Sequence, residues 1–366
     1  MKKPALLIFQ ILVSFFAVAQ SQSLQPFYVG TFTSEGGTGI QYCELNSETG
    51  KLSLIETFKG LDNPAFLSIS KDNRFLYAVA ESSEGYVLAF EILGNGKLRF
   101  INKQFSNGDG PCFVDVSNDG KWVAVANYGG GTVSLFPVEE NGALQPASSV
   151  IVNKGSGPDK SRQEKPHAHS ARFSPFSNTV FSADLGTDHV DIFDLENGKL
   201  VQSSQPFIQM EPGAGPRHIE FHPSGKTIYI INELNSTITS LSKVGEKWES
   251  GESVSTLPIG FNGKSYCADI HISADAKYLY ASNRGHNSVS VFEITVSGLK
   301  LKTNVPVEGN WPRNFTLSPD GKYLLIANQR SGNVTVFRID KNTGIPVFIG
   351  YQLKIKSPVC IKFLNR

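Results

Sequence analysis

The chain has 366 residues, of which 40% are hydrophobic and 18% charged, so it can bury a large core and is too apolar to be disordered. With 34 basic and 33 acidic residues it is almost neutral. It has no basic run with interleaved aromatic side chains, which argues against nucleic acid as a partner.

The first 19 residues have the pattern of a secretory signal peptide. Lys2 and Lys3 precede an apolar run from residue 5 to 18, and Ala17-Val18-Ala19 is a small-x-small cleavage pattern. The run is shorter than the roughly 20 residues that span a membrane. We therefore expect residues 1–19 to be removed. Residues 20–366 should then form a single exported domain, periplasmic or extracellular, without a membrane partner.

The rest of the chain repeats one unit seven times. The unit is clearest from Trp311 to Asp340, where WPRNFTLSPDGKYLLIANQRSGNVTVFRID contains strand-like runs separated by an SPDG turn. The residue after the usual proline, called here the head position, is Ala65, Cys112, His169, Arg217, Ala268, Arg313 and Val359 in successive units. Steps of 45 to 57 residues between these positions, with several strands per unit, predict an all-β fold, a seven-bladed β-propeller.

The two ends of the chain are expected to share the last blade. SPVCIKFLNR at the C-terminus matches only an innermost strand, whereas FYVGTF, GIQYCEL and KLSLIETF near the N-terminus supply three outer strands. This closure leaves no unpaired sheet edge. Asp-Gly, Asn-Gly and Ser-Gly pairs between the runs supply the positive φ angles of tight hairpins.

The four cysteines are expected to be free, buried thiols. Cys112 and Cys267 belong to units that are not neighbours. Cys43 and Cys360 fall on strands of the closing blade that are separated by another strand, and two strand spacings exceed the ~7 Å limit for a disulfide. No CxxC pair is present, so a catalytic cysteine is not expected.

Polar residues gather at one end of the predicted propeller. Head positions, the ends of the second strands and the connections between blades all meet at one rim. Head positions hold His169, Arg217 and Arg313 where other units have small or apolar residues. Second strands end in Asp184, in Asn232-Glu233 and in Asn283-Arg284. Because channel-facing side chains are normally small or apolar, this set predicts an active site at the central mouth.

Other polar residues fit a structural role. Glu81 also follows a second strand, but its own unit has no polar head residue, so we interpret it as a solvated or hydrogen-bonded loop residue. His222 at a turn and His271 in mid-strand are expected to be structural. A short polar residue recurs at the same point of five units. These residues could hydrogen-bond the backbone of the turn or contact the substrate, and both interpretations remain open. They are Asn127, Asp184, Asn232, Asn283 and Asn328.

His167 and His169 are two residues apart on a strand, a spacing that zinc ligands sometimes have. No third histidine or cysteine shares their rim, and the nearby arginines would repel a cation. The sequence therefore predicts neither a metal nor a cofactor.

The connection from residue 153 to 165, NKGSGPDKSRQEK, is longer than its counterparts and should reach the same rim. Its basic residues, Lys154, Lys160, Arg162 and Lys165, outnumber its two acidic ones. Two interpretations remain open: a plain solvated loop, or a flap that attracts an anionic substrate.

The strings PHAHSARFSP, ADLGTDHVDIF, GPRHIEFHPSGK and ASNRGHNSVSVF resemble the propeller-type lactonases, a family that includes bacterial 6-phosphogluconolactonase and the fungal carboxy-cis,cis-muconate lactonizing enzyme. The resemblance runs from about residue 27 to 363. It implies catalytic roles for His169, Arg217, Glu233 and Arg284, which the repeat register selects as well. Around them we expect the substrate to contact His167, Asp184, Asn283, His286 and Arg313.

We therefore predict a monomeric hydrolase that opens a small-molecule sugar lactone. Arginines suit the stabilisation of the carbonyl oxyanion, and Glu233 or His169 is expected to activate the water. No GxSxG elbow indicates a serine nucleophile. The export signal departs from a cytosolic sugar pathway, which leaves two alternatives open: a non-catalytic carbohydrate- or protein-binding propeller, and a muconate-type lactonizing enzyme.

Overall fold

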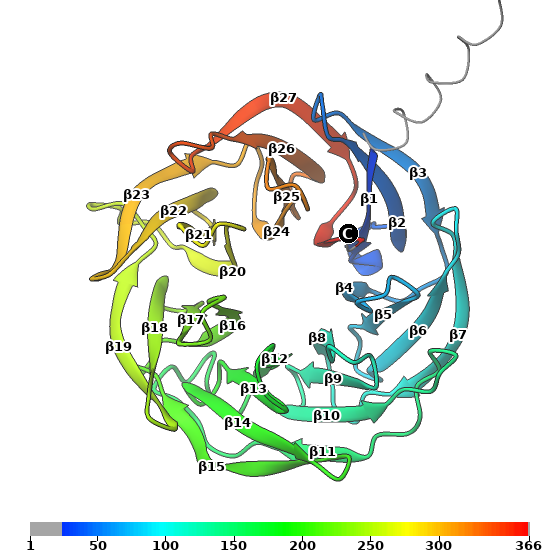
Figure 1. Cartoon of the computed structure of the whole chain (residues 1–366), viewed down its shortest axis with the longest axis vertical. Helices are drawn as coiled ribbons and strands as arrows, with labels where there is room; N and C mark the ends of the chain where they lie inside the picture. Colours follow the sequence, from blue (N-terminus) through cyan, green and yellow to red (C-terminus); the bar gives the residue numbers. More distant parts are fainter. Residues whose placement is uncertain (1–23, 365–366) are drawn as a thin grey trace, which may run out of the picture.

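Seven four-stranded antiparallel sheets surround a central axis (Figure 1). The structure is a computed structural model and describes residues 24–364, so the predicted signal peptide lies outside the described residues. Within the described part of the chain, the one helical element is the 3₁₀ turn η1, Thr33–Glu35, and no helix is long and apolar enough to cross a membrane. The predicted seven-bladed β-propeller is confirmed.

In six blades the strands follow chain order from the innermost outward, and the seventh combines strands from both ends of the chain. The strands of the first four blades are β4 (Pro64–Ile69), β5 (Phe75–Ala80), β6 (Tyr86–Ile92) and β7 (Leu98–Phe105); β8 (Pro111–Val116), β9 (Trp122–Asn127), β10 (Thr132–Pro137) and β11 (Ser149–Val152); β12 (Ala168–Phe173), β13 (Thr179–Asp184), β14 (His189–Glu196) and β15 (Lys199–Gln209); β16 (Pro216–Phe221), β17 (Thr227–Asn232), β18 (Thr237–Val244) and β19 (Lys247–Ser255). The remaining strands are β20 (Tyr266–Ile272), β21 (Tyr278–Arg284), β22 (Ser288–Thr295) and β23 (Gly298–Pro306); β24 (Pro312–Leu317), β25 (Tyr323–Asn328), β26 (Asn333–Ile339) and β27 (Pro346–Lys354); and, in the seventh blade, β28 (Pro358–Phe363), β1 (Leu24–Thr31), β2 (Ile40–Asn46) and β3 (Leu52–Phe58).

The seventh blade joins the two ends of the chain. Strand β28 pairs with β1, with Tyr28 opposite Lys362, and the sheet order is β28-β1-β2-β3. In Figure 1 the red C-terminal strand lies beside the blue N-terminal ones. The predicted closure is confirmed, and all four cysteines are buried and free, as expected.

Buried tyrosines tie neighbouring blades together. The second strands of four blades are buried, and a tyrosine hydroxyl from each donates to a backbone carbonyl in the next blade. The four bonds are Tyr28 to Gly96, Tyr77 to Gly142, Tyr280 to Gly344 and Tyr323 to Glu48, at 2.8 to 3.2 Å. A tyrosine whose hydroxyl is hydrogen-bonded can be buried without leaving an unpaired polar group. Each of these tyrosines therefore buries apolar surface and also fixes the position of its blade relative to the next one.

A register irregularity marks the start of every innermost strand. Pairing shifts between Ala168 and Ser170 and between Pro216 and His218, so the residue in between has no partner. All seven inner strands show such a shift at the head position. A bulge re-aims one side chain relative to the flat strand, and the head residues are therefore set apart structurally as well as by sequence.

Candidate functional site at the propeller mouth

A second ring of side chains lies beside the head residues. It consists of the residues at the end of the second strand of each blade, called here the strand-end positions: Phe32, Glu81, Tyr128, Leu185, Glu233, Arg284 and Gln329. In six blades the backbone N–H of the strand-end residue donates to the carbonyl two residues before the head, as from Glu233 to Gly215 and from Glu81 to Asn63. One backbone bond thus repeats around the mouth and brings both rings to the same rim.

Glu233 is the centre of the mouth on the side of blades 3 to 5. Its Oε2 is 3.0 Å from Nε of Arg217 and 2.6 Å from Nη2 of Arg284, and its Oε1 is 2.7 Å from Nη2 of Arg162. Nε2 of His169 is 4.0 Å from Oε2. The carboxylate is only 4% exposed. One buried carboxylate therefore holds three guanidinium groups from two blades and one loop.

These contacts fix the ionisation of the cluster. Burial opposes the charge of Glu233, but Arg284 and Arg217 outweigh it and hold the pKa of the carboxyl well below its usual range. Burial, with the nearby Arg284, lowers the pKa of Arg217 to about 9, which leaves the guanidinium charged at neutral pH. Glu233 is thus a permanent carboxylate and a poor acceptor for a proton from water.

Arg217 is held from behind by a buried histidine. Burial and the charge of Arg217 lower the pKa of His218 to about 3, so its ring is neutral. Its Nδ1 lies 2.7 Å from Oδ1 of Asp269, a carboxylate that can only accept, so Nδ1 carries the proton. Nη1 of Arg217 lies 3.2 Å from Nε2 and 3.5 Å from Nδ1, so the guanidinium packs against the face of this ring, and the same Nη1 donates to the carbonyl of Ala268. The chain Asp269–His218–Arg217 leaves little freedom for this guanidinium.

His169 is buried but sparsely bonded. It is 5% exposed, with Sγ of Cys112 3.8 Å from Nδ1 and Glu233 4.0 Å from Nε2. Burial and the charge of Arg217 hold the pKa of His169 well below its usual value, so the imidazole is neutral. A neutral ring without a strong hydrogen bond retains a basic nitrogen at the mouth.

The long connection before β12 enters the site. Arg162 bonds Glu233 and also donates to the hydroxyl of Tyr128 at 3.3 Å. The neighbouring Gln163 is fully buried, and its amide donates to the Leu185 carbonyl and to Asp188, which in turn accepts from the N–H of Gly215. The interpretation as a plain solvated loop is therefore wrong for this part of the connection, which is anchored to blade 3 and, through Asp188, to the segment that leads to Arg217.

Four of the expected substrate-binding residues make hydrogen bonds or ring contacts with neighbouring residues. Asp184 accepts from the N–H groups of His167, Gly186 and Thr187, and the amide of Asn283 bonds to Thr256, Ser288 and Ser290. His167 stacks on Tyr128 and contacts Glu164, while His286 bonds Ser288 and packs on Phe261. The structure thus places these four around the mouth and outside the Glu233 cluster.

Arg313 and Glu81 form a separate pair across the mouth. Nη2 of Arg313 is 4.0 Å from Oε1 of Glu81, and its guanidinium lies 5.1 Å from the ring centroid of Phe32. Oε2 of Glu81 is buried and has no hydrogen-bond partner among the described residues. Glu81 is thus a partly exposed loop residue, as we interpreted it, but it also has a charged neighbour in Arg313. Its partner comes from blade 6, which its own unit could not reveal.

Comparisons with known proteins agree with this arrangement. A family profile described as "Lactonase, 7-bladed beta-propeller" matches residues 26–363. A 6-phosphogluconolactonase of Bacillus subtilis strain 168 is 38% identical over 93% of this chain and 98% of its own, and one of Formosa agariphila is 37% identical over 80% and 86%. The periplasmic gluconolactonase of Pseudomonas aeruginosa has a TM-score of 0.88 at 29% identity, over 94% of this chain and 99% of its own.

The chain belongs to the seven-bladed β-propeller lactonase family. The four residues for which the family resemblance implies catalytic roles, His169, Arg217, Glu233 and Arg284, are those that meet at one carboxylate in this lactonase. Arg162, Tyr128 and the His218–Asp269 pair complete the cluster and were not among the expected site residues.

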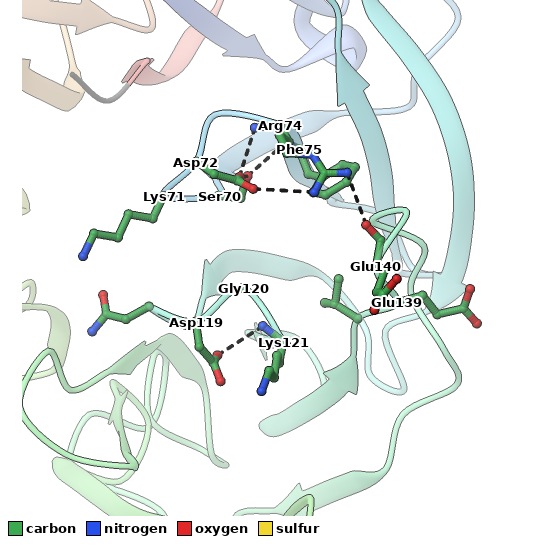
Figure 2. Close-up of a pocket in the computed structure, with 12 residues that line it drawn as sticks. Ser70, Lys71, Asp72, Arg74, Phe75, Asp119, Gly120, Lys121, Glu139 and Glu140 are labelled. Carbon is green, nitrogen blue, oxygen red and sulfur yellow. Dashed lines mark hydrogen bonds and ion pairs between the residues drawn. The ribbon is translucent and has the colours of Figure 1, made fainter.

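A cavity of this lactonase lies away from the mouth. It measures about 460 Å³ and opens between the first two blades, at the turns on the face opposite the mouth (Figure 2). Its polar groups bond one another: Asp72 accepts from Ser70 and from the Arg74 N–H, and Asp119 from the Lys121 N–H. The same serine-aspartate turn recurs in other blades. We therefore assign this cavity to the repeat architecture.

In the part of the chain that the structure describes, no group of three or more histidine, cysteine, aspartate or glutamate side chains is arranged to hold a metal ion. His167 and His169 diverge, because the register shift between Ala168 and Ser170 turns His169 toward Glu233 while His167 packs on Tyr128.

Proposed function

We propose that this protein hydrolyses a sugar δ-lactone at the propeller mouth. The observation that carries the proposal is the convergence of Arg217 and Arg284 on one buried carboxylate beside a neutral His169. Ester hydrolysis needs donors for a developing oxyanion and a base for water. This side of the mouth supplies both, and the names of the relatives point to gluconolactones.

Arg217 and Arg284 serve as the oxyanion donors. Both remain charged, both are buried, and their positions are fixed by Glu233, by the His218–Asp269 pair and by the Cys267 carbonyl, which accepts from Arg284 at 2.9 Å. Donors that are already oriented need no reorganisation when charge develops on the carbonyl oxygen, and this is usually a large contribution to catalysis. Glu233 then acts as the anchor of these donors.

His169 takes the proton from the attacking water. Of the two candidates left open by the sequence, Glu233 is engaged by three guanidinium groups at 2.6 to 3.0 Å, whereas the ring nitrogens of the neutral His169 have contacts only at 3.8 and 4.0 Å among the described residues. As water adds to the carbonyl carbon, one of its protons passes to the imidazole. The protonated ring is then stabilised by Glu233, 4.0 Å away.

The substrate is a small six-membered sugar lactone, and export favours an unphosphorylated one. Residues 1–19 carry the signal-peptide pattern, so we propose a monomer that works in the periplasm or outside the cell. N-terminal sequencing of exported protein should begin near Gln20; a sequence that begins at Met1 would contradict the processing.

The experiment is a pH-stat assay of purified mature protein against glucono-δ-lactone, its 6-phosphate and a panel of other lactones. Acid release above the spontaneous rate from a sugar lactone is expected. Turnover of none, together with sugar binding measured by calorimetry, would support a binding propeller instead. Formation of lactone from a muconate-type diacid in a parallel assay would support the lactonizing alternative.

A further inference from the structure

Lactone opening moves a second proton. When the C–O bond of the ring breaks, the leaving oxygen must receive a proton. Within the Glu233 cluster this donor would have to be the protonated His169, since the carboxylate stays ionised and the arginines stay charged. A separate acid on the other side of the mouth would free His169 from having to reach both the attacking water and the leaving oxygen.

Glu81 occupies the strand-end position of the first blade, which Glu233 occupies in the fourth. The backbone N–H of Glu81 donates to the Asn63 carbonyl at 3.0 Å, the counterpart of the bond from Glu233 to Gly215. Its side chain is 23% exposed, so the carboxyl reaches the mouth while Oε2 stays buried and unbonded. A carboxyl that accepts no strong hydrogen bond is free to carry a proton.

The partner of Glu81 lies two blades away. Arg313 belongs to blade 6, and its guanidinium passes the seventh blade, over Phe32, to come within 4.0 Å of Glu81. Head residues on this side are otherwise small, with Ala65 and Val359 flanking the pair. A ring bound between the two sides would face the oxyanion donors on one flank and Glu81 on the other.

We propose that Glu81 is the general acid that protonates the leaving ring oxygen. The inference rests on the proposed lactonase function and adds a residue to it. Water forms the new C–O bond and gives its proton to His169; the ring C–O bond then breaks and its oxygen takes the proton of Glu81. Solvent returns a proton from His169 to Glu81, so the net reaction consumes one water and yields the hydroxy acid.

The surroundings of Glu81 favour the protonated form. Burial raises the pKa of the carboxyl; Arg313 and Arg217 oppose this, and Glu35 adds to it. Cys112 also faces this carboxyl, and burial raises the pKa of its thiol, so it stays neutral. A carboxyl whose pKa is raised and an imidazole that is neutral form a pair in which one group can donate a proton and the other can accept one.

The test compares Glu81→Gln with the parent in kcat, KM and the pH dependence of kcat on the best lactone. We expect kcat to fall about 100-fold, KM to stay near the parent value, and the alkaline limb of the profile to disappear. Glu81→Asp should keep that limb with partial activity. Glu84→Gln, an exposed carboxylate in the same loop, is the matched control and should behave like the parent.

The variant Arg313→Gln distinguishes a Glu81 that acts as the acid from a Glu81 that only pairs with Arg313. Because Arg313 opposes the raised pKa of Glu81, its loss should move the alkaline limb to higher pH, whereas Glu81→Gln abolishes the limb. If the two variants instead share one profile, or if Glu81→Gln keeps the limb and the parent kcat, Glu81 only positions Arg313 and the inference is overturned. An inactive parent would overturn the lactonase proposal itself. Should Glu81→Gln unfold, the Arg313→Gln shift still decides.

Discussion

Glu233 and Glu81 occupy the same position of the repeat, hold the same backbone bond and face the same mouth, yet their environments differ. Glu233 receives Arg217, Arg284 and Arg162 at 2.6 to 3.0 Å. Glu81 has Arg313 at 4.0 Å and one buried oxygen without a partner among the described residues. The pKa of Glu233 is held low, whereas that of Glu81 is raised.

The difference comes from the residues that other blades and loops contribute. The repeat sets where a side chain points, because the same backbone bond fixes each strand-end residue. Its chemistry depends on which head residues and connections reach it. A propeller can therefore vary the residues around one repeated position and obtain two carboxyl groups whose pKa values are shifted in opposite directions.

The largest expected effect is a loss of folding stability when Glu233 is replaced, which replacement of Glu81 should not cause. Glu233→Gln removes the carboxylate that Arg162, Arg217 and Arg284 share, and leaving buried charges unpaired typically costs about 3–5 kcal/mol. Glu81→Gln should change the free energy of unfolding by less than about 1 kcal/mol, since its ion pair is long and partly exposed. Urea denaturation of both variants measures this. Equal losses would show that the two sites are electrostatically alike.

The second-largest expected effect is the loss of activity when an oxyanion donor is removed. Arg217→Ala is expected to lower kcat about 10²- to 10³-fold, the range measured for such donors. Arg313→Ala, on the other side of the mouth, should lower it less because Arg313 does not contact the Glu233 cluster. Steady-state kinetics with a thermal unfolding check of folding decides. A larger loss for Arg313→Ala would place the oxyanion on the side of Glu81.

Much of the fold follows from the repeat. Turn pairs such as Asp119-Gly120, whose glycine has a φ of 71°, and the partial unit at the C-terminus were sufficient to predict seven blades and the shared last one. The head positions were also readable, because polar residues there break an otherwise small or apolar pattern.

Two parts of the site could not be predicted from the sequence. One lies in a segment that has no counterpart in the other units, and the other lies in a unit whose own residues gave no indication of it. Arg162 lies in an insertion that matches no other unit, so only the folded loop, pinned by Gln163, shows that it reaches Glu233. Glu81 shares the register of Glu233 and could have been found by comparing strand-end positions. It was set aside because its own unit has a small head residue, whereas its partner comes from a distant one.

The contributions of the two carboxylates to folding stability should change with pH in opposite directions. Glu233 has a depressed folded pKa, so its contribution to stability is present above the ordinary glutamate pKa of about 4.3 and is lost as the pH falls below it. Glu81 has a raised folded pKa, so its stability is greatest below about 4.3 and declines as the pH rises through the folded value. Unfolding of parent and glutamine variants between pH 3 and 8 should therefore show the Glu233→Gln deficit shrinking in acid and any Glu81→Gln advantage growing toward neutral pH. Parallel curves would contradict the assignment.

The smallest expected effect tests whether the loop belongs to the Glu233 side. Arg162 is 33% exposed and bonds Glu233 at 2.7 Å, while Lys160, on the same loop, is exposed and bonds only the Gly157 carbonyl. A partly exposed ion pair is worth up to about 1 kcal/mol, so Arg162→Ala should raise KM about two- to fivefold and leave kcat within about twofold. The effect should be larger for an anionic lactone than for a neutral one and should diminish with added salt, because a guanidinium at the mouth attracts negative charge. Lys160→Ala, the matched control, loses the same charge outside the cluster. If both variants raise KM equally, the loop acts through its net charge and not through the contact of Arg162 with Glu233.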